Sequence, residues 1–374
     1  RFLPTLVILK YKTTMENIDK HVLRRYEITQ KLGKGAYGVV WKAIDRKNGQ
    51  VIALKKIFDA FQNTTDSQRT FREIMFLQEI HHDNIVRLRN VLKADNDRDI
   101  YLIFEYMETD LHAVIRANIL EDIHKQYIIY QLLKSLKYLH TGDLVHRDMK
   151  PSNLLLNSDC LMKVADFGLA RSVTEGDEGP IVLTDYVATR WYRAPEILFG
   201  SRYYSTGVDM WSIGCILGEL LGGKPMFPGK STLNQLSKIL NCTGKPNSSE
   251  IASMKSKYAE QMLKSVTIGE RKTLKQSFPF ASKDALDLLS KLLKFNPADR
   301  ITAEQALKHP YVSLFHNPDD EPICRNTIKI CLNDNKKYTV KQYRERLYEE
   351  IKKKKREIRM RAMKQKKHSR QSEK

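Results

Sequence analysis

The chain of 374 residues is longer than one hydrophobic core usually supports, and with 41% hydrophobic residues it predicts two lobes with extensions. Its formal net charge of +20 comes largely from residues 336–374, which hold 17 Lys or Arg and 5 Asp or Glu, so a protein that binds nucleic acid along its whole length is disfavoured. Five irregularly spaced cysteines without zinc-site spacing, and no run long enough to cross a membrane, predict free thiols in a reducing, cytoplasmic compartment.

Residues 26–58 predict three consecutive strands, after an N-terminal extension, residues 1–25, whose apolar start is too short for a signal peptide. The first two strands are joined by the glycine-rich turn Gly33-Lys34-Gly35-Ala36-Tyr37-Gly38. A dinucleotide-binding GxGxxG opens into a helix, whereas this turn opens into another strand, so the Rossmann fold is excluded. The glycines would let the backbone cover phosphates, with Val40 beneath them for a base; an ordinary hairpin is the alternative.

Lys55 is the next charged candidate, on an otherwise apolar strand. A buried lysine needs a counter-charge, and the helical pattern that follows places Glu73 beside the core face. We expect the pair to direct the Lys55 ammonium towards nucleotide phosphates. A surface salt bridge of little energetic value is the alternative.

A buried strand over residues 100–107 leads into Asp110. Backbone amides just beyond such a strand can bind an adenine edge, and Asp110 can reach a ribose hydroxyl. Residues 121–140 then predict an amphipathic helix, whose apolar stripe we assign to the core rather than to a site.

The stretch His146 to Asn153 lies between that helix and an apolar strand. Its functional side chains, Asp148, Lys150 and Asn153, converge only if a tight loop holds them. The grouping suits phosphoryl transfer, in which the Asp accepts a proton from a hydroxyl, the Lys neutralises the moving phosphoryl and the Asn binds a metal. Asp166, at the end of the next strand, is placed to bind the same metal, and such oxygen ligands suit magnesium. A solvated turn is the alternative.

In their order along residues 26–322, these motifs resemble the eukaryotic protein kinases. The match continues through Ala194-Pro195-Glu196, Asp209-Met210-Trp211-Ser212-Ile213-Gly214 and Arg300. The resemblance implies an α+β, bilobal fold. The implied parts are an N-lobe with a small antiparallel sheet and one helix (26–107), a larger and mainly helical C-lobe (108–322) with an activation loop (166–196), and a C-terminal extension (323–374).

Thr184-Asp185-Tyr186 resembles the activation segment of the mitogen-activated protein kinases. Residues 105–116 and 218–225 further resemble the atypical extracellular-signal-regulated branch, the class of mitogen-activated protein kinase fifteen. The resemblance implies activation by phosphorylation of Thr184 and Tyr186, by an upstream kinase or by autophosphorylation. Each phosphate adds nearly two negative charges that can recruit arginines. The arginines placed to meet them are Arg147 for Thr184, and Arg190 and Arg193 for Tyr186.

The resemblance implies a serine/threonine kinase that uses Mg²⁺ and transfers the γ-phosphoryl group of ATP to a Ser or Thr followed by Pro. The implied catalytic residues are Asp148, Lys150, Lys55 and Glu73, with Asn153 and Asp166 as metal ligands. Phe104 matches the gatekeeper position and would close a back pocket. The residues implied to contact ATP are Leu32, Gly33, Lys34, Gly35, Ala36, Tyr37, Gly38, Val40, Ala53, Lys55, Phe104, Glu105, Met107, Asp110 and Leu155.

An acidic docking patch is one family feature from which this sequence departs. Asn317 replaces an acidic residue and leaves Asp319, Asp320 and Glu321, which predicts weak docking of basic partner peptides.

The C-terminal extension begins with Val340, Tyr343, Leu347 and Ile351, a spacing that predicts an amphipathic helix packed back on the kinase. The basic run 352–356 follows it. Such a run can be a nuclear import signal, a contact with nucleic acid or an acidic membrane, or a solvated helix end. No aromatic residue follows Tyr348, so sequence-specific nucleic-acid recognition by stacking is not expected.

Three classes of function compete. An active kinase is favoured because a pseudokinase scaffold would lack Lys55, Asp148 or Asp166, and all three are present. A protein that acts through its basic tail would bind nucleic acid or anionic lipid with a steep salt dependence. A cyclin-dependent kinase is the alternative enzyme, disfavoured by the Thr-x-Tyr motif and by the absence of a cyclin-type motif around Glu73.

Overall fold

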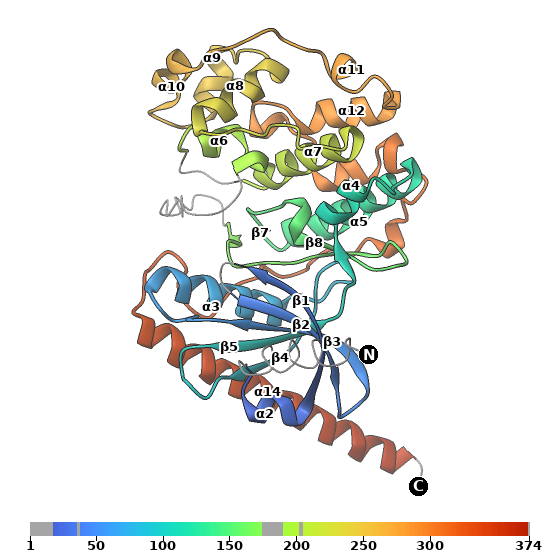
Figure 1. Cartoon of the computed structure of the whole chain (residues 1–374), viewed down its shortest axis with the longest axis vertical. Helices are drawn as coiled ribbons and strands as arrows, with labels where there is room; N and C mark the ends of the chain where they lie inside the picture. The colour runs from blue at the N-terminus through green and yellow to red at the C-terminus, as the bar shows by residue number, and fades with distance from the viewer. Residues whose placement is uncertain (1–17, 36–37, 174–189, 202–204, 373–374) are drawn as a thin grey trace, which may run out of the picture. The chain divides into compact units, whose positions relative to one another are not determined.

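The computed structural model describes residues 18–35, 38–173, 190–201 and 205–372 (Figure 1). The chain forms two compact units. The first comprises the chain up to Gln78, Arg87–Tyr106 and the chain from Lys336, and the second comprises Glu79–Val86 and Met107–Asn335. The C-terminal extension is thus divided, because its part up to Asn335 belongs to the second unit and the rest to the first.

The first unit is built on a five-stranded antiparallel sheet of order β1-β2-β3-β5-β4. The alternation of side chains gives this sheet two different faces. Val39, Trp41 and Ala43 of β2 are buried in the hydrophobic core, while the residues between them are half-buried on the opposite face. The strands are β1 (Tyr26–Gly35), β2 (Gly38–Asp45), β3 (Gln50–Ile57), β4 (Leu88–Lys93) and β5 (Ile100–Glu105).

Among the described residues of the N-lobe, 26–107, the α-helix is α3 (Thr64–Glu79), as the resemblance implied. Two further helices of the first unit lie outside this range, α2 (Lys20–Arg25) and α14 (Val340–Ser372). The tail helix α14 begins at Val340, where its apolar spacing predicts, and runs as one long helix (Figure 1). Tyr343 and Leu347 are buried, and the ring of Tyr343 lies 5.6 Å from that of Phe71 in α3. The amphipathic part of the tail therefore packs on the first unit, as predicted.

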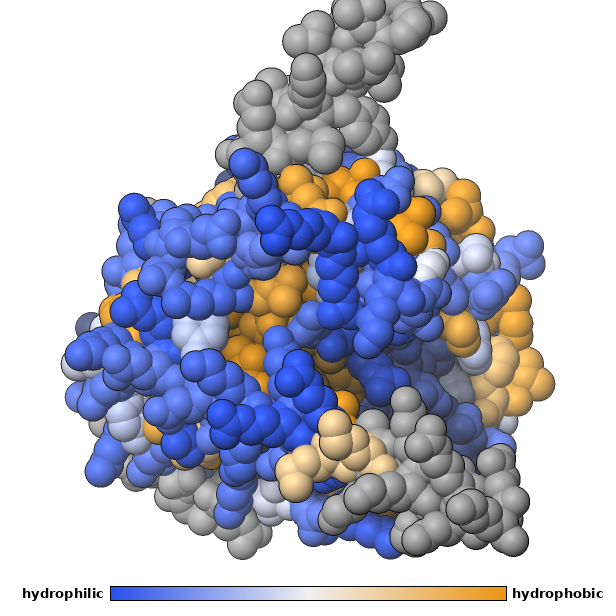
Figure 2. Space-filling model, turned by 90° about the horizontal axis from the view of Figure 1, so that it is seen from below, coloured by the Kyte–Doolittle hydropathy of each residue, from blue (hydrophilic) through white to orange (hydrophobic). Residues whose placement is uncertain are grey.

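Beyond Ile351, two basic residues of α14 contact the backbone of the first unit. Lys354 Nζ donates to the carbonyl of Gln78 at 3.3 Å, and Lys355 Nζ donates to that of Val91 at 2.9 Å. Burial lowers the pKa of Lys355. Viewed from below in Figure 1, where α14 lies, the molecular surface is mainly hydrophilic, with apolar side chains at the bottom of a hollow (Figure 2).

The second unit is mainly helical, with short strands in two small sheets, β6-β8-β9 and β10-β7. Its strands are β6 (Thr109–Asp110), β7 (Leu144–Val145), β8 (Leu154–Leu156), β9 (Met162–Val164) and β10 (Arg171–Ser172). Its α-helices are α4 (Leu111–Ala117), α5 (Asp122–Thr141), α6 (Pro195–Leu198), α7 (Gly207–Gly222), α8 (Thr232–Thr243), α9 (Ser248–Ser253), α10 (Ala259–Ser265), α11 (Leu274–Ser277), α12 (Lys283–Leu292) and α13 (Ala303–Leu307). Its 3₁₀ helices are η1 (Pro151–Asn153), η2 (Arg190–Tyr192), η3 (Pro297–Asp299), η4 (Pro310–Val312) and η5 (Pro318–Asp320).

The core of this unit is centred on α5 and α7. The predicted stripe of α5 is confirmed, because Ile128, Leu132, Leu136 and Leu139 are fully buried. In α7, Gly214 lets the helix approach α12 closely, since a Cβ there would lie 2.6 Å from a methyl group of Leu293. Helices α5 and α7 support β7 and the loop that follows it.

Two predictions from composition concern the whole chain. All five cysteines lie in the described residues, and each is a free thiol, as predicted. Among the described residues, none forms a helix with the length and apolar character that a bilayer requires.

Candidate active site

The first unit brings together Lys55 of β3 and Glu73 of α3. Lys55 Nζ donates to Glu73 Oε1 at 2.8 Å, and the Glu73 side chain is only 8% exposed. The prediction of a pair beside the core is therefore confirmed, and the surface salt bridge is excluded. The Lys55 side chain is 27% exposed, so its ammonium is partly open to solvent while it is paired with the Glu73 carboxylate.

An apolar surface lies beside this ammonium on the half-buried face of the sheet. Val40 of β2 is paired with Lys55 of β3, and Ala53, two residues before Lys55, shares its face. Ala53 in turn is paired with Phe104 of β5, which is 8% exposed. Leu32 of β1 is a more exposed apolar residue of the same sheet. A flat base can pack on this small-residue surface while its phosphates extend towards Lys55.

The glycine-rich turn provides the space that such phosphates need. A Cβ on Gly33 or Gly35 would meet no atom within 4 Å, so these glycines leave open room rather than fill a tight contact. Gly38 differs, since a Cβ there would lie 2.1 Å from the carbonyl oxygen of Lys56. Lys34 is exposed in β1. Ala36 and Tyr37, two of the predicted ATP contacts, lie outside the described residues.

The remaining predicted nucleotide contacts are already engaged or buried in the fold. Glu105, at the end of β5, accepts a hydrogen bond from Arg87 N at 2.8 Å. In the second unit, Met107 is 9% exposed, and Leu155 is half-buried in β8. Asp110 Oδ1 accepts from Ala113 N at 2.9 Å and so caps α4, a structural role that the sequence analysis did not predict.

The second unit gathers the catalytic side chains around Asp148. Lys150 Nζ and Asn153 Nδ2 both donate to Asp148 Oδ2, at 2.6 and 3.2 Å, and Asn153 Nδ2 also donates to the Asp148 carbonyl at 2.9 Å. The other carboxylate oxygen, Oδ1, has no partner among the residues that the structure describes. It is the atom that can accept a hydroxyl proton, so the solvated-turn alternative is excluded.

Asp209, at the start of α7, holds this loop through hydrogen bonds to its backbone. Its two carboxylate oxygens accept from the backbone N–H groups of His146 and Arg147, each at 2.9 Å, and Oδ2 lies 3.1 Å from His140 Nε2. Arg147 has a positive φ of 69°, a backbone strain that these bonds support. Burial would raise the pKa of Asp209, but its hydrogen bonds to His140 and the loop amide hold that pKa below its ordinary value.

The two predicted metal ligands are positioned by the same network. The Ala165 N–H donates to the Asn153 carbonyl at 2.9 Å, which holds the residue before Asp166 against η1. His146 Nε2 lies 3.1 Å from the Ala165 carbonyl, and its ring contacts Phe167 edge-on at 4.9 Å. Since Asn153 uses its nitrogen towards Asp148, its amide oxygen stays available. A carboxylate and an amide oxygen form a hard donor set that fits Mg²⁺, with the other ligands left to phosphates and water.

A buried ion pair supports the end of the activation segment. Arg300 donates to both carboxylate oxygens of Glu196, each at 2.7 Å, and the two side chains are 0% and 3% exposed. The guanidinium also donates to the carbonyls of Gly207 and Phe295, both at 2.9 Å. Arg300 and Glu196, two residues of the kinase-like motifs, are therefore paired in the fold.

The regulatory residues are described only in part. Thr184 and Tyr186 lie outside the described residues. Arg190 NH1 donates to the Lys230 carbonyl at 3.3 Å, Arg147 lies in the catalytic loop, and Arg193 directly follows η2. Their pairing with phosphates stays a prediction.

Sequence reasoning missed two supporting residues. His140 was classed as the end of an amphipathic helix, yet it contacts the carboxylate that holds the catalytic loop. Tyr192 donates its hydroxyl proton to Glu219 at 2.6 Å in a buried contact that ties η2 to α7. Only the position of His140, six residues before His146, could have suggested its role.

Comparison with known proteins agrees with this arrangement of paired lysine, catalytic loop and metal ligands. The chain belongs to the protein kinases, because residues 26–312 match the protein kinase domain family. Within them it belongs to the mitogen-activated protein kinases, as its similarity to individual members shows, and it is an ATP-dependent serine/threonine kinase that uses Mg²⁺.

Three relatives illustrate this similarity. The chain is 66% identical to extracellular signal-regulated kinase 2 of Dictyostelium discoideum, over 92% of this chain and 94% of that protein. It is 55% identical to mitogen-activated protein kinase 15 of Xenopus laevis, over 91% of this chain and 59% of the relative. Identity to mitogen-activated protein kinase 15 of Caenorhabditis elegans is 51%, over 91% and 74% of the two chains. The predicted resemblance to the atypical branch is confirmed.

Proposed function

We propose that the protein phosphorylates Ser or Thr residues followed by Pro in partner proteins, with Asp148 as the proton acceptor. The observation that carries this proposal is the Asp148 carboxylate, held by Lys150 and Asn153 through one oxygen and open at the other. Oδ1 accepts the proton of the attacking hydroxyl, and Lys150 then shields the negative charge of the transferred phosphoryl. Asn153 and Asp166 would hold Mg²⁺, which would supply positive charge to neutralise the ATP phosphates.

The substrate preference can be tested with two peptides that differ in one residue. A Ser-Pro peptide and its Ser-Ala counterpart are incubated with the purified kinase and radiolabelled ATP. We expect kcat/KM to be higher for the Ser-Pro peptide by about tenfold or more. Equal rates for both peptides would contradict the preference while leaving the phosphoryl transfer itself intact.

We further propose that phosphorylation of Thr184 and Tyr186 activates the kinase, and that it phosphorylates itself there. Support comes from the similarity to mitogen-activated protein kinase 15 proteins and from the placement of Arg147 beside Asp148, where a bound phosphate would act on the catalytic loop. The test is intact mass spectrometry after incubation with Mg²⁺ and ATP, with Asp148→Asn as the control. Two added phosphates in the wild type alone are expected. No added phosphate in either protein would mean that a separate kinase is required.

The acidic docking patch is proposed to bind basic peptides only weakly. Two of its three carboxylates are already paired within the second unit. Lys134 Nζ lies 2.6 Å from Asp320 Oδ2, and Glu321, 3% exposed, accepts from Asn317 N at 3.1 Å and lies 2.7 Å from His316 Nδ1. Only Asp319 keeps an open carboxylate. We expect Asp319→Asn to reduce binding of a basic docking peptide by less than about threefold, measured by fluorescence anisotropy.

We propose a cytoplasmic protein that also enters the nucleus through the run Lys352–Arg356. Lys352, Lys353 and Arg356 are exposed on α14, whereas Lys354 and Lys355 donate to backbone carbonyls. Imaging of a fluorescent fusion tests this, with Lys352→Ala/Lys353→Ala/Arg356→Ala as the variant. An unchanged nuclear fraction would contradict the signal without affecting the proposed kinase activity.

A further inference from the structure

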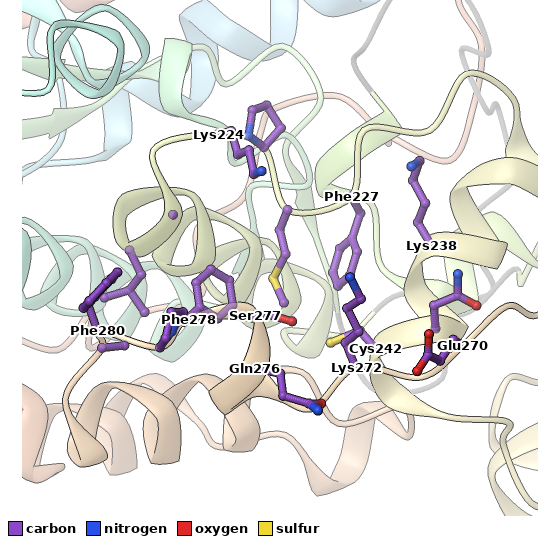
Figure 3. A pocket seen from close by; sticks show the side chains of 17 residues that line it. Lys224, Phe227, Lys238, Cys242, Glu270, Lys272, Gln276, Ser277, Phe278 and Phe280 are labelled. Atoms are coloured by element: carbon purple, nitrogen blue, oxygen red, sulfur yellow. The ribbon is translucent and has the colours of Figure 1, made fainter.

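A pocket of about 640 Å³ lies in the second unit, outside all the residues assigned to phosphoryl transfer (Figure 3). It is formed by the end of α7 and the segment after it, the C-terminal half of α8, and the residues on either side of α11. Its volume is in the range of pockets that bind small ligands or single peptide side chains. The side chains that line it spread from Phe280 at one end to Lys238 and Glu270 at the other (Figure 3).

The apolar part of this pocket is formed by buried and closely packed aromatic side chains. Phe227 is 3% exposed and stacks on Trp211 of α7, with ring centroids 6.1 Å apart. Phe278 is 8% exposed and lies against the backbone of Gly222, where a Cβ would come within 3.0 Å of its ring. Burial raises the pKa of the Cys242 thiol to about 11, so this side chain is neutral at physiological pH. The base of the pocket can therefore accept an aliphatic or aromatic group without rearrangement.

The charged side chains that line the pocket are mainly lysines, and these lysines have no ionic partner among the described residues. The ammonium groups of Lys224, Lys238 and Lys272 line it, and none of them has an ion pair or hydrogen bond with any residue that the structure describes. Glu270 is the single carboxylate in the lining. Asn241 holds the segment that carries Lys272, because its side chain accepts from Gly269 N at 2.7 Å and its carbonyl accepts from Lys272 N at 3.2 Å. An anionic group would find several cationic side chains here that have no partner among the described residues.

Phe280 at the edge of the pocket is 99% exposed, although it sits on an ordered turn. The turn is held by Lys275 Nζ, which donates to the Pro279 carbonyl at 2.9 Å, and by Ala281 N, which donates to the Phe278 carbonyl at 3.2 Å. An aromatic ring held in water beside a pocket is typical of protein interfaces, where large rigid side chains contribute most of the binding energy. A small anion inside the pocket would leave this ring uncovered, whereas a peptide would cover it.

We propose that this pocket binds a short segment of a partner protein in which an acidic side chain stands beside an aliphatic or aromatic one. The apolar side chain enters between Phe227 and Phe278, the carboxylate pairs with the three lysines, and the peptide backbone passes over Phe280. This charge preference is opposite to that of the acidic docking patch, so the two surfaces select different partners. The inference goes beyond the proposed kinase activity and does not depend on it.

Fluorescence anisotropy with the full chain tests the proposal. The probe is a short labelled peptide with a central Leu-Phe pair flanked by glutamates, and the matched peptides carry lysines for the glutamates or alanines for the Leu-Phe pair. We expect the acidic Leu-Phe peptide to bind at least about tenfold more tightly than either control, and to weaken as salt is added. Equal binding of all three peptides, or no binding, would overturn the proposal.

Matched variants of the protein locate the binding. Phe280→Ser and the double variant Lys238→Glu/Lys272→Glu should each weaken the acidic peptide by about fivefold or more. Leu314→Ser and Lys264→Glu change exposed residues of the same types outside the pocket and should leave affinity unchanged. Phosphorylation of a generic basic substrate serves as a folding control, because no variant touches a catalytic residue. Equal losses in pocket and control variants, or displacement of the peptide by an equal concentration of inorganic phosphate, would overturn a peptide site here.

Discussion

Lys150 holds Asp148 by an ion pair of 2.6 Å between Nζ and Oδ2, which leaves Oδ1 as the accepting oxygen of the catalytic carboxylate. Both side chains are mostly buried, at 18% and 10% exposure, so the pair is screened little by solvent. The two oxygens thus differ: Oδ2 is held by the loop, whereas Oδ1 has no partner among the described residues and is open to a substrate hydroxyl.

Asp148→Asn is therefore expected to lower kcat by about 10²–10⁴-fold, the usual contribution of a general base, because an amide cannot accept the proton. Nucleotide affinity should change little, since the lost oxygen acts on the hydroxyl. Steady-state kinetics and binding of a fluorescent ATP analogue measure the two quantities. Asp159→Asn, in an exposed turn, is the matched control. Turnover retained within a few-fold in Asp148→Asn would refute the assignment.

A second prediction concerns Lys55, which Glu73 holds at 2.8 Å. Lys55→Met removes the positive charge beside the phosphates, and we expect kcat to fall by about 10²–10³-fold, as for other lost charge-stabilising donors. The loss should appear mainly in kcat rather than in KM, because the lysine positions phosphates for transfer. Lys31→Met, at an exposed position of β1, controls for the loss of a surface charge. A rise in KM with unchanged kcat would contradict this role.

The features that could be predicted from the sequence are those whose signal is local. The α5 stripe and the tail stripe at Tyr343 and Leu347 follow from helical spacing, and both are buried as expected. Asp148, Lys150 and Asn153 lie within six residues, so one loop suffices to bring them together. The pair of Lys55 and Glu73 could be predicted because a buried lysine requires a counter-charge nearby.

What the sequence did not reveal depends on contacts between distant segments. His140 and Asp209 are 69 positions apart, and no periodicity links them. The patch residue Glu321 is buried, and its carboxylate lies 3.7 Å from Nζ of Lys137 in α5, which stands more than 180 residues before it. The sequence left three interpretations open for the basic run, and none of them predicts that Lys354 and Lys355 donate to carbonyls of the first unit. Such contacts are set by packing rather than by local pattern.

Disrupting the buried pair of Arg300 and Glu196 by a single substitution should lower the stability of the protein strongly. Arg300→Lys keeps the charge but loses the bidentate geometry and the bonds to three carbonyls, so it leaves a buried carboxylate poorly paired. We expect the free energy of unfolding to fall by about 3–5 kcal/mol, measured by urea denaturation. The exposed pair Lys308 and Glu304, 63% and 62% exposed, is the control. Glu304→Gln should change the free energy of unfolding by less than about 1 kcal/mol, and a similar small change in Arg300→Lys would contradict the prediction.

His82 should make the stability depend on pH in the mildly acidic range. Its Nδ1 accepts from Asn84 N at 2.9 Å, while its Nε2 is buried without a hydrogen-bond partner among the described residues. Burial, assisted by the nearby Lys134, lowers its pKa from 6.5 to about 4. Between these two values the unfolded chain binds the proton more readily, so the free energy of unfolding falls as the pH decreases from 6.5 towards 4.

His82→Asn tests this linkage, because the asparagine oxygen can still accept from Asn84 N while the titrating ring is removed. Between pH 7 and pH 5 the wild type should lose about 1–2 kcal/mol more stability than His82→Asn, as the pKa shift requires. Urea denaturation at both pH values gives the difference. His81→Asn replaces the exposed neighbouring imidazole and should keep the wild-type dependence. Identical pH dependence in all three proteins would show that His82 titrates normally in the folded state.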